Sequence, residues 1–138
     1  MLTKLWTIGI KVRNLEQELA FHRSIGNQIV LDETLEFEGE KFRIPLIQMG
    51  DKYIHLAEKM VYERLLEQPL GYGIAHIVYR SDDFENDRQK ALASGARSIG
   101  PIAQISAGFG TRRVAFLQTP NCWMFEIIEV LTDLVPEV

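Results

Sequence analysis

The sequence has little of several residue types, and each shortage excludes a class of protein. A single cysteine, Cys122, in 138 residues excludes an internal disulfide and a cysteine-based zinc knuckle. A net charge of −4 and a pI near 5.4 argue against nucleic acid as a partner, because phosphate binding depends on clustered Lys and Arg. No apolar run is long enough to cross a bilayer, and residues 1–14 lack the layout of a signal peptide. We therefore expect a cytoplasmic protein that contacts neither nucleic acid nor membrane.

Two similar apolar stretches indicate that the chain consists of two copies of one structural module. Residues 6–13 (WTIGIKVR) and 73–80 (GIAHIVYR) alternate as strands with two different faces do. Each precedes an amphipathic helix, predicted over 15–25 and 83–94. The predicted N-caps are Asn14 and Asp82, and the predicted helix stops are Gly26 and Gly95. Further strands are expected at 28–35, 42–49, 53–57, 96–99, 112–117 and 123–130.

This order predicts an α+β fold made of two βαβββ modules, at about residues 4–58 and 73–130. The modules are expected to form a curved mixed sheet around a cleft, with the helices outside. Residues 59–70 join the two copies. The small-residue-rich stretch 100–110 (GPIAQISAGFG) is predicted to be a mobile lid or pocket rim.

Strand alternation places two histidines and one carboxylate on the cleft face: His55, His76 and Glu126. A buried glutamate between Phe125 and Ile127 is costly unless it is paired or binds a metal. Two His and one carboxylate are a sufficient ligand set for a divalent metal, with positions left for substrate or water. Spacing alone also allows a structural role for His76 in a half-buried strand.

The chain resembles the vicinal-oxygen-chelate superfamily, which includes glyoxalase I, methylmalonyl-CoA epimerase, extradiol dioxygenases and the fosfomycin and bleomycin resistance proteins. The resemblance covers about residues 4–130. It rests most on residues 73–84 (GIAHIVYRSDDF) and 112–129 (RRVAFLQTPNCWMFEIIE), where a Pro-Asn turn leads into a glutamate. It implies one glyoxalase-like domain over 1–138, and a homodimer.

The resemblance also implies a ligand set, which it transfers position by position. His76 and Glu126 match family ligands on the first and last strands of the second module. His55 stands where glyoxalase I has a glutamate, and Thr7 stands where metal enzymes of the family often have a ligand. The implied metal site is therefore His55, His76 and Glu126, and it departs from glyoxalase I, from the epimerase and from the dioxygenases. The replacement of a second carboxylate by His55 also argues against a two-base epimerase.

The functional hypothesis is a metal-dependent enzyme of glyoxalase-like lyase or isomerase type. It would act on a small substrate with vicinal oxygens, with Zn, Ni, Mn or Fe bound and Glu126 as the catalytic carboxylate. Two alternatives remain open: an Fe(II)-dependent dioxygenase, and a metal-free small-molecule binding or resistance protein. The predicted substrate-binding residues are Lys11, Tyr53, Arg80 and Met124.

Overall fold

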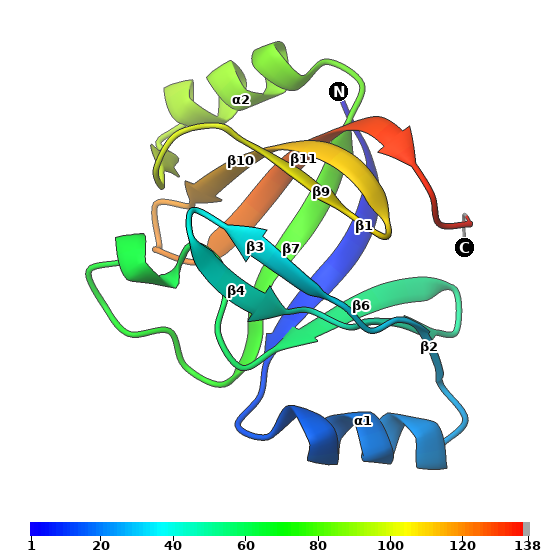
Figure 1. Ribbon diagram of the computed structural model, residues 1–138. Coiled ribbons are helices and arrows are strands. Elements are labelled where there is room, and N and C mark those ends of the chain that lie inside the picture. Colours follow the sequence, from blue (N-terminus) through cyan, green and yellow to red (C-terminus); the bar gives the residue numbers. More distant parts are fainter. Residues whose placement is uncertain (137–138) are drawn as a thin grey trace.

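One mixed sheet runs through the molecule and carries two helices, as the computed structural model shows (Figure 1). The strand order is β2-β5-β6-β1-β7-β11-β10-β8, and β9 pairs with β10 off this path. A separate hairpin, β3-β4, lies in the foreground of Figure 1. The structure describes residues 1–136, so the last two residues of the predicted 1–138 domain lie outside it. The predicted α+β class is confirmed.

The first half of the chain opens with a long strand and a capped helix. The Asn14 side chain accepts a hydrogen bond from the Gln17 N–H at 3.0 Å, and Gly26 follows the helix at φ +89°, as the sequence predicts. The elements are β1 (Leu2–Lys11), α1 (Leu15–Ser24), β2 (Gln28–Leu31), β3 (Thr34–Phe37), β4 (Glu40–Arg43), β5 (Leu46–Met49) and β6 (Lys52–Ala57).

The second half follows a connection that contains one short 3-10 turn, Glu63–Leu65, and again begins with a strand and a helix, but four strands follow its helix where five follow α1. In each half the first and last strands are parallel neighbours, β1 with β6 and β7 with β11. The two halves meet where β1 pairs antiparallel with β7. The elements are β7 (Gly73–Ser81), α2 (Phe84–Ala93), β8 (Arg97–Ser98), β9 (Ala103–Ala107), β10 (Gly110–Gln118) and β11 (Met124–Asp133).

Three predictions of local structure are wrong. The stretch 100–110 is not a mobile lid, because β9 pairs with β10 and alternates half-buried and exposed residues; the alternative of a pocket rim holds, since Ile105 and Phe109 line a cavity. The strands predicted over 28–35 and 42–49 each break in two; the second breaks before Pro45, which has no N–H to donate. Asp82 does not cap α2. Instead the Ser81 hydroxyl accepts from the Asp83 N–H at 3.0 Å, and Asp82 pairs with the N-terminal amine at 2.7 Å.

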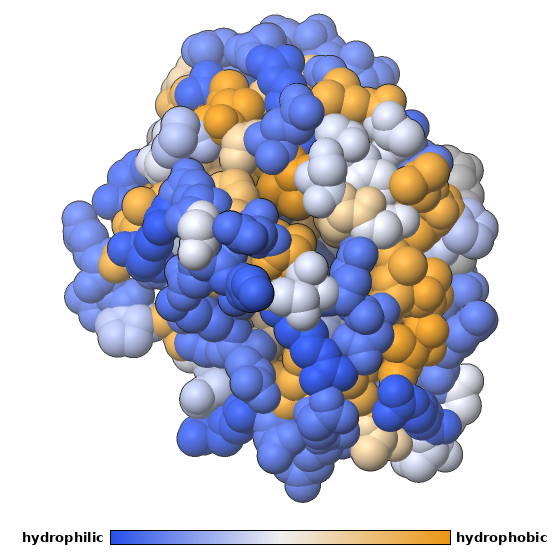
Figure 2. Space-filling model, in the orientation of Figure 1, coloured by the Kyte–Doolittle hydropathy of each residue, from blue (hydrophilic) through white to orange (hydrophobic). Residues whose placement is uncertain are grey.

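The sheet has an outer face under the helices and an inner face that forms the main core. Leu19 of α1 packs with Ile54 and Leu56 of β6, and Phe84 of α2 packs with Leu117 and Ile127. Figure 2 shows hydrophilic side chains over both helices and apolar ones in the region between them. None of the helices in the described part of the chain is long and apolar enough to cross a bilayer.

Candidate functional site

The three predicted ligands come from adjacent strands of the inner face. Gly9 on β1 lies opposite His55 of β6 on one side and opposite His76 of β7 on the other. Glu126 of β11 pairs with Val78, two residues along β7 from His76. Because β6, β1, β7 and β11 are consecutive in the sheet, the side chains of His55, His76 and Glu126 meet above Gly9.

Their donor atoms are in direct contact. The two imidazole Nε2 atoms of His55 and His76 are 3.0 Å apart, and their rings pack edge to face with centroids 5.1 Å apart. His76 Nε2 is also 2.9 Å from Oε2 of Glu126. His76 is 2% exposed and Glu126 is 8% exposed. A buried carboxylate is costly without a partner, and the imidazole of His76 is the partner of Glu126.

The environment separates the protonation states of two of these groups. Burial raises the pKa of the Glu126 carboxyl, but the charge and hydrogen bond of His76, with the charge of His55, outweigh burial, so the net pKa lies below its usual range. Burial, with the charge of His76, lowers the pKa of His55 to about 4. At neutral pH the site therefore holds an ionised carboxylate and a neutral imidazole at position 55.

Tyr62 is a site residue that the sequence analysis missed. Its hydroxyl oxygen is 2.7 Å from Nδ1 of His76, and the residue is 1% exposed. Burial raises the pKa of the phenol, so it stays protonated. Tyr62 belongs to the connection between the halves, where strand alternation gives no face assignment, so no periodic signal pointed to it.

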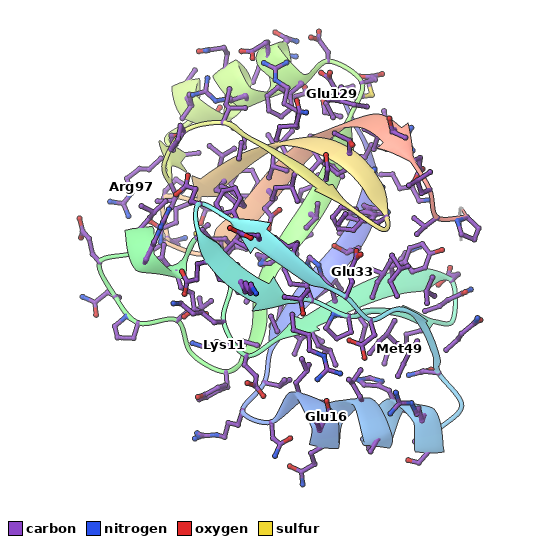
Figure 3. The ribbon with its side chains drawn as sticks, in the orientation of Figure 1. Lys11, Glu16, Glu33, Met49, Arg97 and Glu129 are labelled. Carbon is purple, nitrogen blue, oxygen red and sulfur yellow. The ribbon has the colours of Figure 1, made fainter. Side chains whose placement is uncertain are left out.

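The cluster of His55, His76, Glu126 and Tyr62 lines a cavity of about 50 Å³. Apart from the cluster and Arg112, the lining is formed by apolar side chains, including Met60, Val78 and Val114. Part of it comes from segments that cross the inner face: Leu35 of β3 and Ile105 of β9. The side chain of Glu33 ties these segments together, since its Oε1 accepts from the Gly108 N–H at 2.6 Å (Figure 3). A cavity with apolar walls and few polar groups is typical of a small-molecule site.

Arg112 is a second buried charge at this cavity and is 1% exposed. Its guanidinium donates to the carbonyl oxygens of Thr132 at 2.5 Å and Phe109 at 3.0 Å, and to Asp133 Oδ1 at 3.0 Å. The guanidinium carbon lies 4.8 Å from the ring centroid of Trp6. These contacts fix one end of β10 against β11.

The four predicted substrate-binding residues lie elsewhere among the described residues, and none lines this cavity. Lys11, at the lower end of the sheet in Figure 3, donates to Glu63 Oε2 at 2.9 Å and to the Leu70 carbonyl oxygen at 3.1 Å. The Tyr53 hydroxyl donates to the Pro136 carbonyl oxygen at 2.6 Å. Arg80 pairs with Ile128 at the far end of β7, and Met124 is buried opposite His76. Their roles toward a substrate stay predictions.

Thr7 occupies the opening-strand position where the resemblance leads one to expect a ligand. It is 1% exposed, and among the described residues its Oγ1 has no hydrogen-bond partner. A buried hydroxyl without a partner costs about 1–3 kcal/mol. Thr7 Oγ1 and Arg112 Nε are the two buried side-chain atoms that residues 1–136 leave without a hydrogen-bond partner.

The donor set can be compared with the needs of a divalent metal. Imidazole and carboxylate suit Zn, Ni, Mn and Fe, and ligands about 2.1 Å from one ion lie about 3 Å apart at right angles. The contacts of 3.0 and 2.9 Å match that separation. As the side chains lie, however, residues 1–136 include no group of three or more His, Cys, Asp and Glu that could hold an ion. The donor atoms are of types that bind these metals. To bind an ion, the side chains of His55, His76 and Glu126 would have to exchange their contacts with one another for contacts with the ion.

No protein-family model matches the sequence, and no curated protein matches it either. Solved structures do match. A Streptomyces coelicolor methylmalonyl-CoA epimerase variant in complex with 2-nitronate-propionyl-CoA is 21% identical, with a TM-score of 0.71 over 96% of this chain and 100% of that chain. The Mycobacterium tuberculosis methylmalonyl-CoA epimerase is 18% identical, with a TM-score of 0.70 over 95% and 90%.

A catechol 2,3-dioxygenase is 12% identical, with a TM-score of 0.64 over 99% of this chain and 46% of that one. Both the epimerases and the dioxygenase belong to the superfamily that the sequence resembles. Identities this low establish the shared architecture and leave the chemistry open. The chain therefore has the fold of the vicinal-oxygen-chelate superfamily.

Proposed function

We propose that this protein is a metal-dependent enzyme of lyase or isomerase type that acts on a small substrate with vicinal oxygens. The observation that carries the proposal is the buried contact of Glu126 with His76 and of His76 with His55 in an apolar cavity. A protein that needed only a stable core would lose little by replacing such a cluster with apolar side chains. The ligands in this proposal are His55, His76 and Glu126.

The chain's own residues supply acid–base chemistry in this scheme. Ionised Glu126 takes a proton from a carbon next to a carbonyl group, and the electron pair of that C–H bond moves into the carbonyl. The same carboxyl group then returns the proton to the former carbonyl carbon, while the vicinal hydroxyl group gives its proton to the former carbonyl oxygen and becomes the new carbonyl group, which completes an isomerisation. A divalent cation held by His55, His76 and Glu126 would supply stabilisation of the negative charge on the carbonyl oxygen. Apolar walls keep water from competing for the proton.

The structural neighbours act on different classes of substrate. One neighbour is a methylmalonyl-CoA epimerase in complex with methylmalonyl-CoA, and another is a catechol 2,3-dioxygenase. The cavity of about 50 Å³ favours a reacting group of only a few atoms. Zn, Ni or Mn in the purified protein would favour the lyase or isomerase, and Fe with oxygen consumption would favour the dioxygenase. The proposal includes a cytoplasmic homodimer, which light scattering of the purified protein tests for oligomeric state.

The deciding experiment is elemental analysis of protein purified without a histidine tag. We expect about one ion per chain, and a large loss of metal in Glu126→Gln and in His76→Ala. The matched control is His22→Ala, because His22 is also a buried histidine, 4% exposed, but lies on α1 and contacts Asn27. Equal occupancy in all three variants would contradict the ligand assignment.

A metal-free binding protein is the second candidate function. It is favoured by the mutual contacts of the donor atoms and by the threonine at the opening-strand position. If the untagged protein takes up no Zn, Ni, Mn or Fe after incubation with each ion, this candidate replaces the first. Binding of small apolar ligands, measured by fluorescence of Trp6 at the cavity, would then be the assay of choice.

A further inference from the structure

We propose that Tyr62 and Gly9 are positioning residues that hold the imidazole ring of His76 in its ligating orientation. This inference deepens the proposed metal site and rests on it. It assigns a function to the connection between the two halves, for which the strand pattern predicts only a linking role. It also assigns a function to Gly9, whose φ does not itself require a glycine.

The first contact fixes one edge of the ring. Tyr62 Oη lies 2.7 Å from Nδ1 of His76, on the side of the ring away from Nε2. When Nε2 binds a cation, Nδ1 carries the ring proton and donates it to an oxygen acceptor. The phenol oxygen of Tyr62 occupies the position of this acceptor. Partners of this kind fix both the tautomer and the tilt of a metal-binding histidine.

The second contact fixes the face of the ring. A methyl group built on Gly9 would lie 2.4 Å from Cε1 and Nε2 of His76, which is shorter than real contacts allow. Gly9 also lies directly opposite both His55 and His76 in the strand register. The ring of His76 therefore occupies the space above Gly9, and the missing side chain is what lets the two imidazoles meet.

Tyr62 can position another group only if it is itself held in place. Its ring packs 5.5 Å from that of Phe116, and the residue is 1% exposed. The next residue, Glu63, forms an ion pair with Lys11 at 2.9 Å and accepts from the Met60 N–H at 2.9 Å. Lys11 also binds the Leu70 carbonyl oxygen. Lys11 of β1 thus anchors the connection at Glu63 and Leu70, both on the C-terminal side of Tyr62, which gives Lys11 a structural role.

The test compares two tyrosines that differ in what they touch. Tyr62→Phe removes the hydroxyl at His76, and Tyr53→Phe removes the hydroxyl of a tyrosine that is also 1% exposed and binds the Pro136 carbonyl oxygen. Zn²⁺ affinity is measured by competition with a chelator. We expect about 10- to 100-fold weaker binding in Tyr62→Phe, typical for loss of a partner behind a metal ligand, and wild-type affinity in Tyr53→Phe. Wild-type affinity in Tyr62→Phe would overturn the inference.

Gly9→Ala is the second variant, with Gly71→Ala as its control. Gly71 also has no positive φ, and a methyl group there meets nothing within 4 Å. We expect Gly9→Ala to weaken Zn²⁺ binding at least as much as Tyr62→Phe, and Gly71→Ala to leave it unchanged. Far-UV circular dichroism and Tm on the same samples separate a displaced ring from a failure to fold.

A readout in the metal-free protein keeps this inference separate from the proposed function. The chain has three histidines, so the side-chain nitrogen resonances of His76 can be assigned by their loss in His76→Ala. We expect Tyr62→Phe to shift the His76 Nδ1 resonance while His22 stays in place. Wild-type protein that binds no Zn²⁺ would refute the metal site, and an unmoved Nδ1 resonance would refute the role of Tyr62.

Discussion

The two halves of the chain have the same strand pairing but different side chains at matching positions. In both, the first strand lies parallel to the last, and the last two strands form an antiparallel pair. Thr7 and His76 occupy matching places 69 residues apart, and His55 and Glu126 are 71 residues apart. The backbone thus offers four inward positions in two equivalent pairs, and the second half fills both of its own with residue types that bind metals in other proteins, His76 and Glu126.

This difference indicates that fold and chemistry are specified separately. The repeated strand pairing depends on apolar residues toward the helices, such as Ile54 in one half and Ile127 in the other. The inner positions are free of that requirement, so threonine, histidine and glutamate can occupy equivalent places without changing the sheet. Each of the following variants makes the two halves more alike or more different, in order of expected effect.

The largest effect is expected at Arg112, which has an apolar residue, Phe42, 70 positions earlier. Arg112→Met makes this place apolar as well. It removes the guanidinium that donates to Asp133 and to the carbonyl oxygens of Thr132 and Phe109, although the Phe109 oxygen keeps its bond from the Leu134 N–H. We expect a loss of about 3 kcal/mol in the free energy of unfolding, measured with urea, because breaking a buried charge pair strands its partners.

The neighbouring arginine is a matched control for this variant. Arg113 points to the other face of β10 and forms ion pairs with Glu85 of α2 and with Glu129. Its side chain is 34% exposed, and such pairs contribute about 0–1 kcal/mol. Equal losses in Arg113→Met and Arg112→Met would show that Arg112 has no special part in joining β10 to β11.

An intermediate effect is expected at Thr7, the weakest of the four inward positions. Thr7→Val keeps the shape and removes the buried hydroxyl that has no partner among the described residues. We expect the metal-free protein to gain about 1 kcal/mol, because an unsatisfied buried polar group is lost. Thr111→Val is the control, since its hydroxyl lies 2.9 Å from Ser106 Oγ and that contact would be lost. Destabilisation by Thr7→Val would mean that the hydroxyl has a bound water or ligand as partner.

Much of this comparison could be predicted from the sequence because strand alternation has a period of two. That period placed His55, His76 and Glu126 on one face, and the structure brings these three into contact. The repeated order of strands and helices likewise predicted the α+β class. Adjacent Arg112 and Arg113 had to face opposite sides, and they do.

The parts that escaped prediction depend on long-range contacts without a period. Tyr62 reaches His76 from an irregular connection, whose path is set by the ion pair of Lys11 with Glu63. For the same reason Lys11, expected at a substrate, is occupied in holding that connection. The strand Ala103–Ala107 looked like a loop because its small residues carry little strand propensity, and pairing with β10 overrides that propensity.

The smallest expected effect concerns the last turn of each half, where both halves need a left-handed residue. The first half has Gly50 at φ +61°, and 72 residues later the second half has Cys122 at φ +67°. A residue with a side chain pays about 1–2 kcal/mol in this region, whereas glycine does not. Cys122→Gly should therefore raise the free energy of unfolding by about 0.5 kcal/mol, because the greater backbone freedom of glycine in the unfolded chain offsets part of the relieved strain, and Gly50→Ala should lower it by a similar amount. Urea unfolding of both variants measures this directly. A loss of stability in Cys122→Gly would mean that the contact of its sulfur with Arg97, at 3.8 Å, outweighs the backbone strain.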